Sequence, residues 1–385
     1  MHHPEGHASR LTLHVDRLVR NARAVSACLS PRTRLLAVVK ANAYGHGLEA
    51  AASILAPLNE VTAFGVSALR EATVLRQQRV QKPILILGPT AIDHYPRAAA
   101  EGLSLTIHQP WQIDGLTRYA HMAPGGTLSV HLKVDTGLHR LGFPADEIPG
   151  LLADLAHLRP AVKVSGLYSH FHSADTEDLA SAKAQLKCFR GLVAELERQD
   201  LRPPLCHIAN SAATLRIPEA HMDMVRVGGA LYGLNPNHEH CRLPETIQPV
   251  LSWRTEVVQV HEVRAGTALG YGLCWQARRP SRIAVLPVGY TDGLPRTAPG
   301  VVLVRDQTVP LVGTRSMNVS FVDVTGIDNP PVQPGERITL IGSDRGSTLY
   351  CSRIADLEGT IEYEVTARIP ESDRILRAIA GDATA

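Results

Sequence analysis

Leu35-Leu-Ala-Val-Val-Lys-Ala-Asn-Ala-Tyr-Gly-His-Gly47 is the stretch around which the rest of the chain is organised. Its five apolar residues, Leu35 to Val39, predict a short buried strand that ends abruptly at Lys40. A glycine-punctuated loop is expected next, and then a helix over Leu48–Leu55. A lysine at the end of a buried parallel strand is poorly hydrated, which lowers its pKa and makes its amine a nucleophile. For an arbitrary strand end, the commoner alternative is a lysine that snorkels to solvent.

Short apolar runs alternate with helical patterns from residue 35 to about residue 233. We predict strands over residues 35–39, 62–66, 84–87, 103–107, 128–134, 162–167, 205–208 and 224–227. We predict helices over residues 68–76, 111–119, 148–155 and 180–196. Such alternation is typical of βα units, and eight of them predict an α/β fold with a TIM-like (β/α)8 barrel. The active site should then lie at the C-terminal ends of the strands.

Polar or small residues stand where the later strands end. The fifth strand ends at Lys133, and Arg140 follows it; these two cations would repel each other at one site unless Asp135 pairs with one of them. After the sixth strand comes His170, which could also be a hydrogen-bonded structural residue. The seventh and eighth strands end in the segments His207-Ile-Ala-Asn210-Ser211 and Arg226-Val-Gly228-Gly229. Small residues there suit a phosphate held by backbone N–H groups.

A second domain is predicted after a proline-spaced linker over residues 234–250. Short apolar runs over residues 252–260, 282–288, 301–304, 320–324 and 338–341 predict a β-rich fold. We expect a barrel domain over residues 15–240 and a β-rich C-terminal domain over residues 241–385. An N-terminal strand over residues 9–14 is expected to pair with the second domain. Tyr271 and Tyr290 adjoin glycines in this domain, a setting in which tyrosines often only anchor loops.

Composition narrows the classes of protein. A chain of 385 residues favours two domains, and its net charge of +2 gives no field that would attract nucleic acid or anionic lipid. The six cysteines lack a CxxC pair and are typical of reduced cytosolic thiols. No apolar run approaches the ~18 residues of a membrane span. The leader containing His2, His3 and His7 lacks the apolar core of a signal peptide and favours a polar segment over a metal site. We expect a cytoplasmic protein without a metal.

The lysine stretch closely resembles the pyridoxal-phosphate lysine motif of the alanine racemases, which have fold type III. At least six separate segments match this family in order, over nearly the whole chain. The resemblance implies that pyridoxal 5'-phosphate is bound covalently by Lys40 and that Tyr44 contacts its phosphate. It places the remaining cofactor contacts at His170, stacked on the pyridine ring, at Asn210, and at Ser211, Gly228 and Gly229 on the phosphate.

The resemblance also assigns the cations. Arg226 would face the pyridine nitrogen with support from His207. Lys133 matches a lysine that the family carbamylates to N6-carboxylysine, an anion that orients Arg140 toward the cofactor and the substrate carboxylate. The family often has a small residue in place of His139.

Arg226 carries a mechanistic implication of its own. A guanidinium does not give up a proton, so it cannot protonate the ring nitrogen. A neutral pyridine is a weaker electron sink than the pyridinium that an aspartate stabilises. A poorly delocalised carbanion is quickly reprotonated at Cα, which favours racemisation over transamination.

The implied reaction is the racemisation of L-alanine and D-alanine, which supplies D-alanine for peptidoglycan. Inversion with proton exchange needs bases on both faces of Cα. The resemblance assigns them to Lys40 and to Tyr271 of the partner subunit in a homodimer, with Tyr290 in a supporting position. The backbone N–H of Met317 would reach the substrate carboxylate.

Two departures concern the entrance of the site. Asn318 stands where the family commonly has an aspartate, after Met317 in the pattern Cys-Met-Asp. The segment Glu362-Tyr363-Glu364 fits the family, but a gate tyrosine expected near Glu371 is absent. The missing tyrosine predicts a wider entrance that favours larger neutral substrates such as serine, while Asn318 removes a charge that would attract lysine. The alternative to an alanine racemase is therefore a broader racemase that also accepts serine, lysine or other amino acids.

Two other classes share this barrel. A barrel-type amino-acid decarboxylase is disfavoured by Arg226, because such enzymes usually place an acid at the ring nitrogen. A non-enzymatic pyridoxal-phosphate carrier is disfavoured by the β-rich domain that contains Tyr271.

Overall fold

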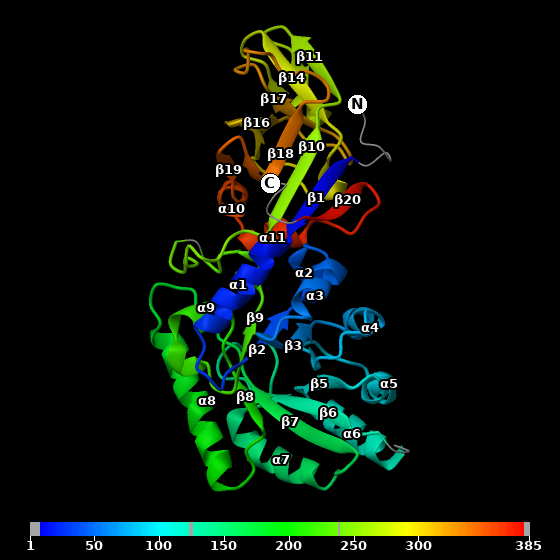
Figure 1. Cartoon of the computed structure of the whole chain (residues 1–385), viewed down its shortest axis with the longest axis vertical. Coiled ribbons are helices and arrows are strands. Elements are labelled where there is room, and N and C mark those ends of the chain that lie inside the picture. Colours follow the sequence, from blue (N-terminus) through cyan, green and yellow to red (C-terminus); the bar gives the residue numbers. More distant parts are fainter. Residues whose placement is uncertain (1–7, 123–125, 238, 381–385) are drawn as a thin grey trace.

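The structure is a computed structural model that describes residues 8–122, 126–237 and 239–380. His2, His3 and His7 lie outside the described residues. The molecule is elongated, with a barrel of strands and helices at one end and a sheet-rich region at the other (Figure 1). Over the described residues, no helix is long and apolar enough to cross a membrane.

Eight parallel strands form the nearly closed barrel. They are β2 (Arg34–Val38), β3 (Val61–Val66), β4 (Ile84–Ile86), β5 (Leu103–Ile107), β6 (Leu128–Lys133), β7 (Val162–Tyr168), β8 (Leu205–His207) and β9 (Met224–Val227). Their order is β8-β7-β6-β5-β4-β3-β2-β9, so β8 and β9 stand at the two ends of the sheet. The predicted (β/α)8 barrel is confirmed, and each predicted strand end lies within one residue of the observed one.

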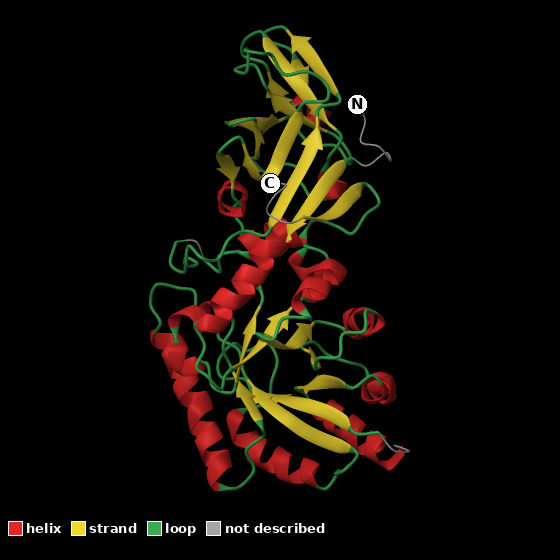
Figure 2. Ribbon diagram, in the orientation of Figure 1, coloured by secondary structure: helices red, strands yellow, loops and turns green. Residues whose placement is uncertain are grey.

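Helices cover the outside of this barrel (Figure 2). They are α1 (Val15–Ala27), α3 (Leu48–Leu55), α4 (Leu69–Gln77), α5 (Tyr95–Ala100), α6 (Pro110–Met122), α7 (Ile148–Ala156), α8 (Ala180–Arg198) and α9 (Ser211–Arg216). Each longer helix turns an apolar stripe inward, as Leu186, Phe189 and Leu196 do on α8. The resulting core fixes the strands rigidly, and with them the residues at their ends.

The second region is a ten-stranded, mostly antiparallel sheet. Its strands are β1 (Ser9–His14), β10 (Leu251–Glu256), β11 (Gln259–Val263), β14 (Ser281–Leu286), β15 (Val301–Val304), β16 (Gln307–Val312), β17 (Ser320–Asp323), β18 (Arg337–Asp344), β19 (Ser347–Leu349) and β20 (Ile375–Ala380). The short strands β12 (Ala268–Leu269) and β13 (Trp275–Gln276) form a separate ribbon. The predicted β-rich region is confirmed.

The two ends of the described chain meet in this sheet. Strand β1 pairs antiparallel with β10 and parallel with β20. Two helices that the sequence did not indicate, α10 (Cys351–Glu358) and α11 (Glu362–Ala367), follow β19. Helix α11 lies between the sheet and the mouth of the barrel in Figure 1, where it contacts the segment after β2.

Candidate active site

A cavity of about 700 Å³ opens at the C-terminal ends of the barrel strands. The topology brings ten of the sequence-predicted site residues to its wall, and these are Lys40, Tyr44, Lys133, Arg140, His170, Asn210, Ser211, Arg226, Gly228 and Gly229. His207 lies directly behind this wall, in hydrogen-bond contact with Arg226. Tyr271, Tyr290, Met317 and Asn318 line a different pocket in the β-rich region.

The segment after Lys40 is a left-handed helical turn rather than the predicted loop. In α2 (Lys40–Tyr44), the residues Ala41 to Tyr44 have φ angles of 53° to 56°. Four non-glycine residues in this conformation cost roughly 1–2 kcal/mol each. Side chains hold the turn in place, because Glu71 accepts the N–H of Ala41 at 2.7 Å and Asn42 accepts the N–H of Leu48 at 2.7 Å.

The β-rich region fastens the same turn from the other side. Arg377 of β20 donates to the carbonyl oxygen of Gly45 at 2.9 Å. A Cβ at Gly45 would come within 1.9 Å of the carbonyl oxygen of Thr366 in α11, so only glycine fits this contact. Contacts from both regions therefore hold the strained turn that presents Lys40.

Several cations surround the base of the cavity. Burial lowers the pKa of Lys40, and the positive charges of Arg140 and Arg226 lower it further. Burial, followed by Arg226 and Arg140, lowers the pKa of Lys133 to about 7. A substantial neutral amine fraction is therefore present at Lys133 near neutral pH.

Asp135 turns toward its own loop. One of its carboxylate oxygens accepts the backbone N–H groups of Gly137 at 2.9 Å and His139 at 3.1 Å. The other oxygen faces the ring of His139 at 3.3 Å. The amine of Lys133 lies 4.6 Å from the centre of the Tyr168 ring. The carboxylate of Asp135 therefore contacts His139 and the backbone of its own loop.

Arg226 is buried and donates four hydrogen bonds. It donates to the carbonyl oxygens of Ser169 at 2.8 Å and Ile208 at 3.2 Å. It also donates to Nδ1 of His207 at 2.8 Å and Nδ1 of His170 at 3.0 Å. Because a guanidinium only donates, both ring nitrogens must accept, which places the remaining proton of each neutral imidazole on Nε2. Burial and the charge of Arg226 hold the pKa of both histidines well below its usual range, so both stay neutral.

His207 connects this group to the interior of the barrel. Its Nε2 lies 3.0 Å from Nδ1 of His131, and its ring stacks on Tyr168 with a centroid distance of 4.9 Å. The hydroxyl of Tyr168 lies 2.9 Å from the hydroxyl of Thr106. These interior contacts hold Arg226 in one position at the cavity wall.

Two glycines leave room at the mouth for tyrosine hydroxyls. A Cβ at Gly228 would lie 2.3 Å from the hydroxyl of Tyr44, and one at Gly229 would lie 2.3 Å from the hydroxyl of Tyr363. Ser211 accepts the backbone N–H of Gly228 at 3.2 Å. Burial raises the pKa of Tyr44 to about 12 and that of Tyr363 well above its usual range, so both phenols remain hydrogen-bond donors.

Tyr363 is a cavity residue to which the sequence analysis gave no role. It comes from α11, and its ring meets that of Tyr44 edge to face with centroids 5.5 Å apart. The segment Glu362-Tyr363-Glu364 carries the signal for this tyrosine, at a position before the Glu371 site where the family resemblance predicts one. Glu371 is exposed and does not line the cavity. Tyr363 lines this cavity, so a tyrosine is present at its mouth, and the wider entrance stays a prediction.

The second pocket, of about 520 Å³, lies on turns of the β-rich region. Tyr271 begins η5 (Tyr271–Leu273), and Tyr290 begins η6 (Tyr290–Asp292). The side chains of Tyr271 and Met317 are 66% and 60% exposed. The cavity around Lys40 and this pocket share no lining residue.

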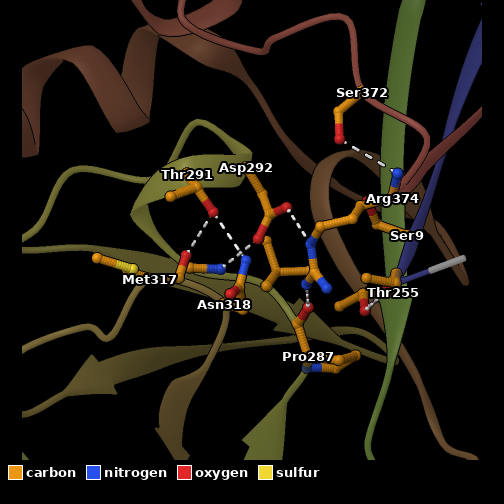
Figure 3. A network of polar contacts seen from close by, with 12 residues as sticks. Ser9, Thr255, Pro287, Thr291, Asp292, Met317, Asn318, Ser372 and Arg374 are labelled. Carbon is orange, nitrogen blue, oxygen red and sulfur yellow. Dashed lines mark hydrogen bonds and ion pairs between the residues drawn. The ribbon is translucent and has the colours of Figure 1, made fainter.

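A polar network holds the turns of this second pocket (Figure 3). Arg374 pairs with the buried carboxylate of Asp292 at 2.9 Å, and Asp292 accepts the N–H of Gly289 at 2.8 Å. The hydroxyl of Thr291 donates to the carbonyl oxygen of Met317 at 2.8 Å, and the amide of Asn318 donates to that hydroxyl at 2.8 Å. The backbone around Met317 is therefore fixed although its side chain is exposed.

Comparisons with known proteins agree along the whole chain. Two family models match, the alanine racemase N-terminal domain over residues 13–236 and the alanine racemase C-terminal domain over residues 250–378. The chain is 39% identical to an alanine racemase of Desulfosudis oleivorans over 92% of this chain and 94% of that protein. It is 37% identical to an alanine racemase of Streptococcus suis over 97% and 98% of the two chains.

Solved structures give the same result. The crystal structure of alanine racemase from Bacillus anthracis with bound L-Ala-P superposes with a TM-score of 0.90 at 30% identity, over 99% of this chain and 97% of that one. The alanine racemase from the D-cycloserine producer Streptomyces lavendulae superposes with a TM-score of 0.87 at 31% identity, over 97% of each chain.

Proposed function

The chain belongs to the alanine racemase family and is an isomerase that interconverts L-alanine and D-alanine, and from this premise we propose how its own residues carry out the reaction. The family depends on pyridoxal phosphate. We propose that this chain binds the cofactor in the cavity around Lys40 and that the D-alanine it makes serves peptidoglycan synthesis.

The cavity wall fits such a cofactor. Gly228 and Gly229 leave space beside the hydroxyls of Tyr44 and Tyr363 that any Cβ would fill. Hydroxyl and backbone N–H donors at the mouth suit a phosphate, and the cations at the base suit anionic groups. Lys40, on its fastened turn, is the residue that would hold the cofactor. When bound, pyridoxal phosphate supplies an electron-accepting ring that makes the Cα proton of an amino acid acidic.

The observation that carries the proposal is the fourfold donation by buried Arg226. Its guanidinium has no proton to give at physiological pH, so the ring nitrogen opposite it would stay unprotonated. The neutral imidazoles of His170 and His207 add no acid at this point. This arrangement limits electron withdrawal from Cα and favours return of a proton to that carbon. Racemisation is then preferred over transamination.

Lys40 would move the proton on one face of Cα. A base must be unprotonated to accept a proton, and burial together with Arg140 and Arg226 favours the neutral amine of Lys40. Tyr271 would act on the opposite face. Within one chain it does not line the Lys40 cavity, and its side chain is largely exposed.

We therefore propose a homodimer in which the Tyr271 of a second copy completes the site. The side chains of Tyr271, Leu273 and Met317 are exposed, and the backbone of the Met317 turn is held by Thr291. A largely exposed aromatic and apolar group of this kind is typical of an interaction surface. The backbone N–H of Met317 would arrive with Tyr271 and contact the substrate carboxylate, together with Arg140.

Carbamylation of Lys133 is also part of the proposal. The neutral amine fraction that a pKa of about 7 provides is the form that reacts with CO2. A carbamate would turn one of three neighbouring cations into an anion and so relieve their repulsion. All six cysteines are free, which supports a place of action in the reducing cytoplasm.

A chiral assay tests the proposed function. Purified protein with added pyridoxal phosphate is incubated with L-alanine or D-alanine, and both enantiomers are measured by chiral chromatography. Convergence to an equal mixture from either side is expected, with little keto acid formed. Lys40 should be the residue that borohydride labels in the cofactor complex. Label on Lys133 instead, or accumulation of keto acid in place of the other enantiomer, would contradict the assignment.

A further inference from the structure

His108 is a buried histidine whose ring has no partner in the part of the chain that the structure describes. It follows β5 directly and is 4% exposed. Neither Nδ1 nor Nε2 has a hydrogen-bond partner among the described residues. Its backbone is held, because its N–H donates to the side-chain oxygen of Gln112 at 2.8 Å.

Strand register places this ring beside Lys133. Strands β5 and β6 pair Thr106 with His131 and Ile107 with Leu132, so continuing this register by one residue beyond β5 sets His108 opposite Lys133. Side chains two residues apart on a strand point to the same face. Thr106 and His131 contact Tyr168 and His207 inside the barrel. His108 and Lys133 therefore continue the same interior face at the cavity end, on strands about 4.8 Å apart.

The charged group beside His108 offers hydrogen-bond donors and no acceptor. Burial and the charge of Lys133 lower the pKa of His108, so its imidazole is neutral, with one N–H donor and one acceptor nitrogen. An ammonium at Lys133 can only donate. It offers the imidazole N–H no acceptor, and buried donors in native proteins are nearly always paired. A carboxylate attached to the amine of Lys133 would supply acceptor oxygens at this place.

We propose that His108 is a positioning residue that donates its ring N–H to the carbamate of Lys133. This inference rests on the carbamylation proposed above. The lone pair of the neutral Nζ attacks the carbon of CO2 and forms an N–C bond. One C=O electron pair moves onto oxygen to give the carboxylate, and one Nζ proton leaves to solvent. Arg140 then approaches the carbamate from the cavity side, while His108 donates to it from the neighbouring strand.

Carbon-13 NMR with labelled bicarbonate tests the proposal without depending on activity. At pH 8, above the pKa of about 7 of the Lys133 amine, the wild-type holoenzyme should show a carbamate signal that Lys133→Ala lacks. His108→Leu removes the donor, and the bicarbonate concentration that gives half the signal should rise about tenfold or more, as expected for one hydrogen bond to a charged group. His108→Gln keeps an N–H donor and should stay closer to the wild type.

His221→Leu is the matched control. His221 is a buried histidine with one unpartnered ring nitrogen among the described residues, and it precedes β9 at the opposite end of the barrel. Its loss should leave the bicarbonate midpoint unchanged. If His108→Leu does not fold, nitrogen-15 spectra of histidine-labelled wild type give the same information. Bicarbonate should shift one imidazole signal in the wild type and none in Lys133→Ala.

The outcomes separate the two proposals. A wild-type carbamate signal with the same midpoint in His108→Leu would overturn the role of His108 and leave carbamylation standing. The absence of a carbamate signal in the wild type would overturn both the carbamylation of Lys133 and the role of His108. The conclusion that the protein racemises alanine would still stand.

Discussion

The two groups of predicted site residues differ in how far a single chain completes them. At the barrel mouth, Arg226 has four protein acceptors, and the turn after Lys40 is tied down by Glu71 and Arg377. On the β-rich region, Asp292 and Arg374 hold the turn that precedes Leu294, and Thr291 holds the Met317 turn, yet the side chains of Tyr271 and Met317 are exposed. The residues of the first group make their contacts within one chain. In the second group, the side chains of Tyr271 and Met317 are exposed in the single chain.

This difference separates two costs in free energy: backbone strain that contacts within the chain offset, and exposed apolar side chains that a second subunit would bury. The left-handed turn costs free energy that contacts within the chain recover. The exposed apolar surface of the tyrosine and the methionine also costs free energy, and this cost is removed only if another surface buries it. Dimerisation would therefore complete the catalytic set and remove the exposed group in one step.

Replacing Lys40 should produce the largest effect. Lys40→Ala removes the proposed cofactor-holding amine and one base, and kcat for alanine should fall by about 10³-fold or more. Thermal unfolding of the cofactor-free protein should change little, because Glu71 and Arg377 hold the turn through backbone atoms. The exposed Lys163 at the other end of the barrel provides the control Lys163→Ala. Equal losses in both variants would contradict the assignment.

Breaking the network of the second group should have an intermediate effect. Asp292→Asn removes the charge that pairs with Arg374, and the free energy of unfolding should fall by about 1–3 kcal/mol, because Asp292 is 1% exposed. The KM for alanine should rise as the Met317 turn loosens. Urea denaturation and steady-state kinetics measure the two effects. Asp306→Asn, at an exposed carboxylate, should change neither.

Asn318→Asp should produce the smallest effect. Aspartate has no N–H to donate to Thr291, although the Thr291 hydroxyl keeps its bond to Met317. One lost hydrogen bond predicts a rise in the KM for alanine of about threefold to tenfold with kcat unchanged. Asn318→Ala separates the lost hydrogen bond from the added charge. Serine and lysine should remain poorer substrates than alanine in all three proteins, because the bulky ring of Tyr363 lines the cavity. Faster turnover of serine or lysine than of alanine in the wild type would contradict this view of the mouth.

Much of the barrel could be predicted from sequence because its apolar runs end abruptly at charged or small residues. The end of each strand then placed Lys40, Lys133, His170, Arg226 and Gly228 at one rim, since parallel strands share an orientation. Local pattern and topology were sufficient for these residues. No knowledge of distant contacts was needed.

Other features depend on contacts that a local pattern does not record. The left-handed turn of Ala-Asn-Ala-Tyr contains no glycine that would predict it. Hydrogen bonds from Glu71 and from the β-rich region stabilise it. Tyr363 reaches the cavity because α11 packs on the barrel mouth. Strand β16 was missed because polar residues and Pro310 interrupt its alternation. The unpartnered ring of His108 became visible only through burial and strand register.

Mixing two inactive variants tests the shared site most directly. Lys40→Ala and Tyr271→Phe are each purified, combined in equal amounts under conditions that exchange subunits, and assayed for alanine racemisation. If each site takes Lys40 from one copy and Tyr271 from the other, each mixed dimer holds one intact site. Activity should then recover to about a quarter of the wild-type value, because half of the dimers are mixed and each has one of two sites intact. If mixed dimers form, as shown by native mass spectrometry, and activity stays at the level of the separate variants, the two groups do not meet in one active site.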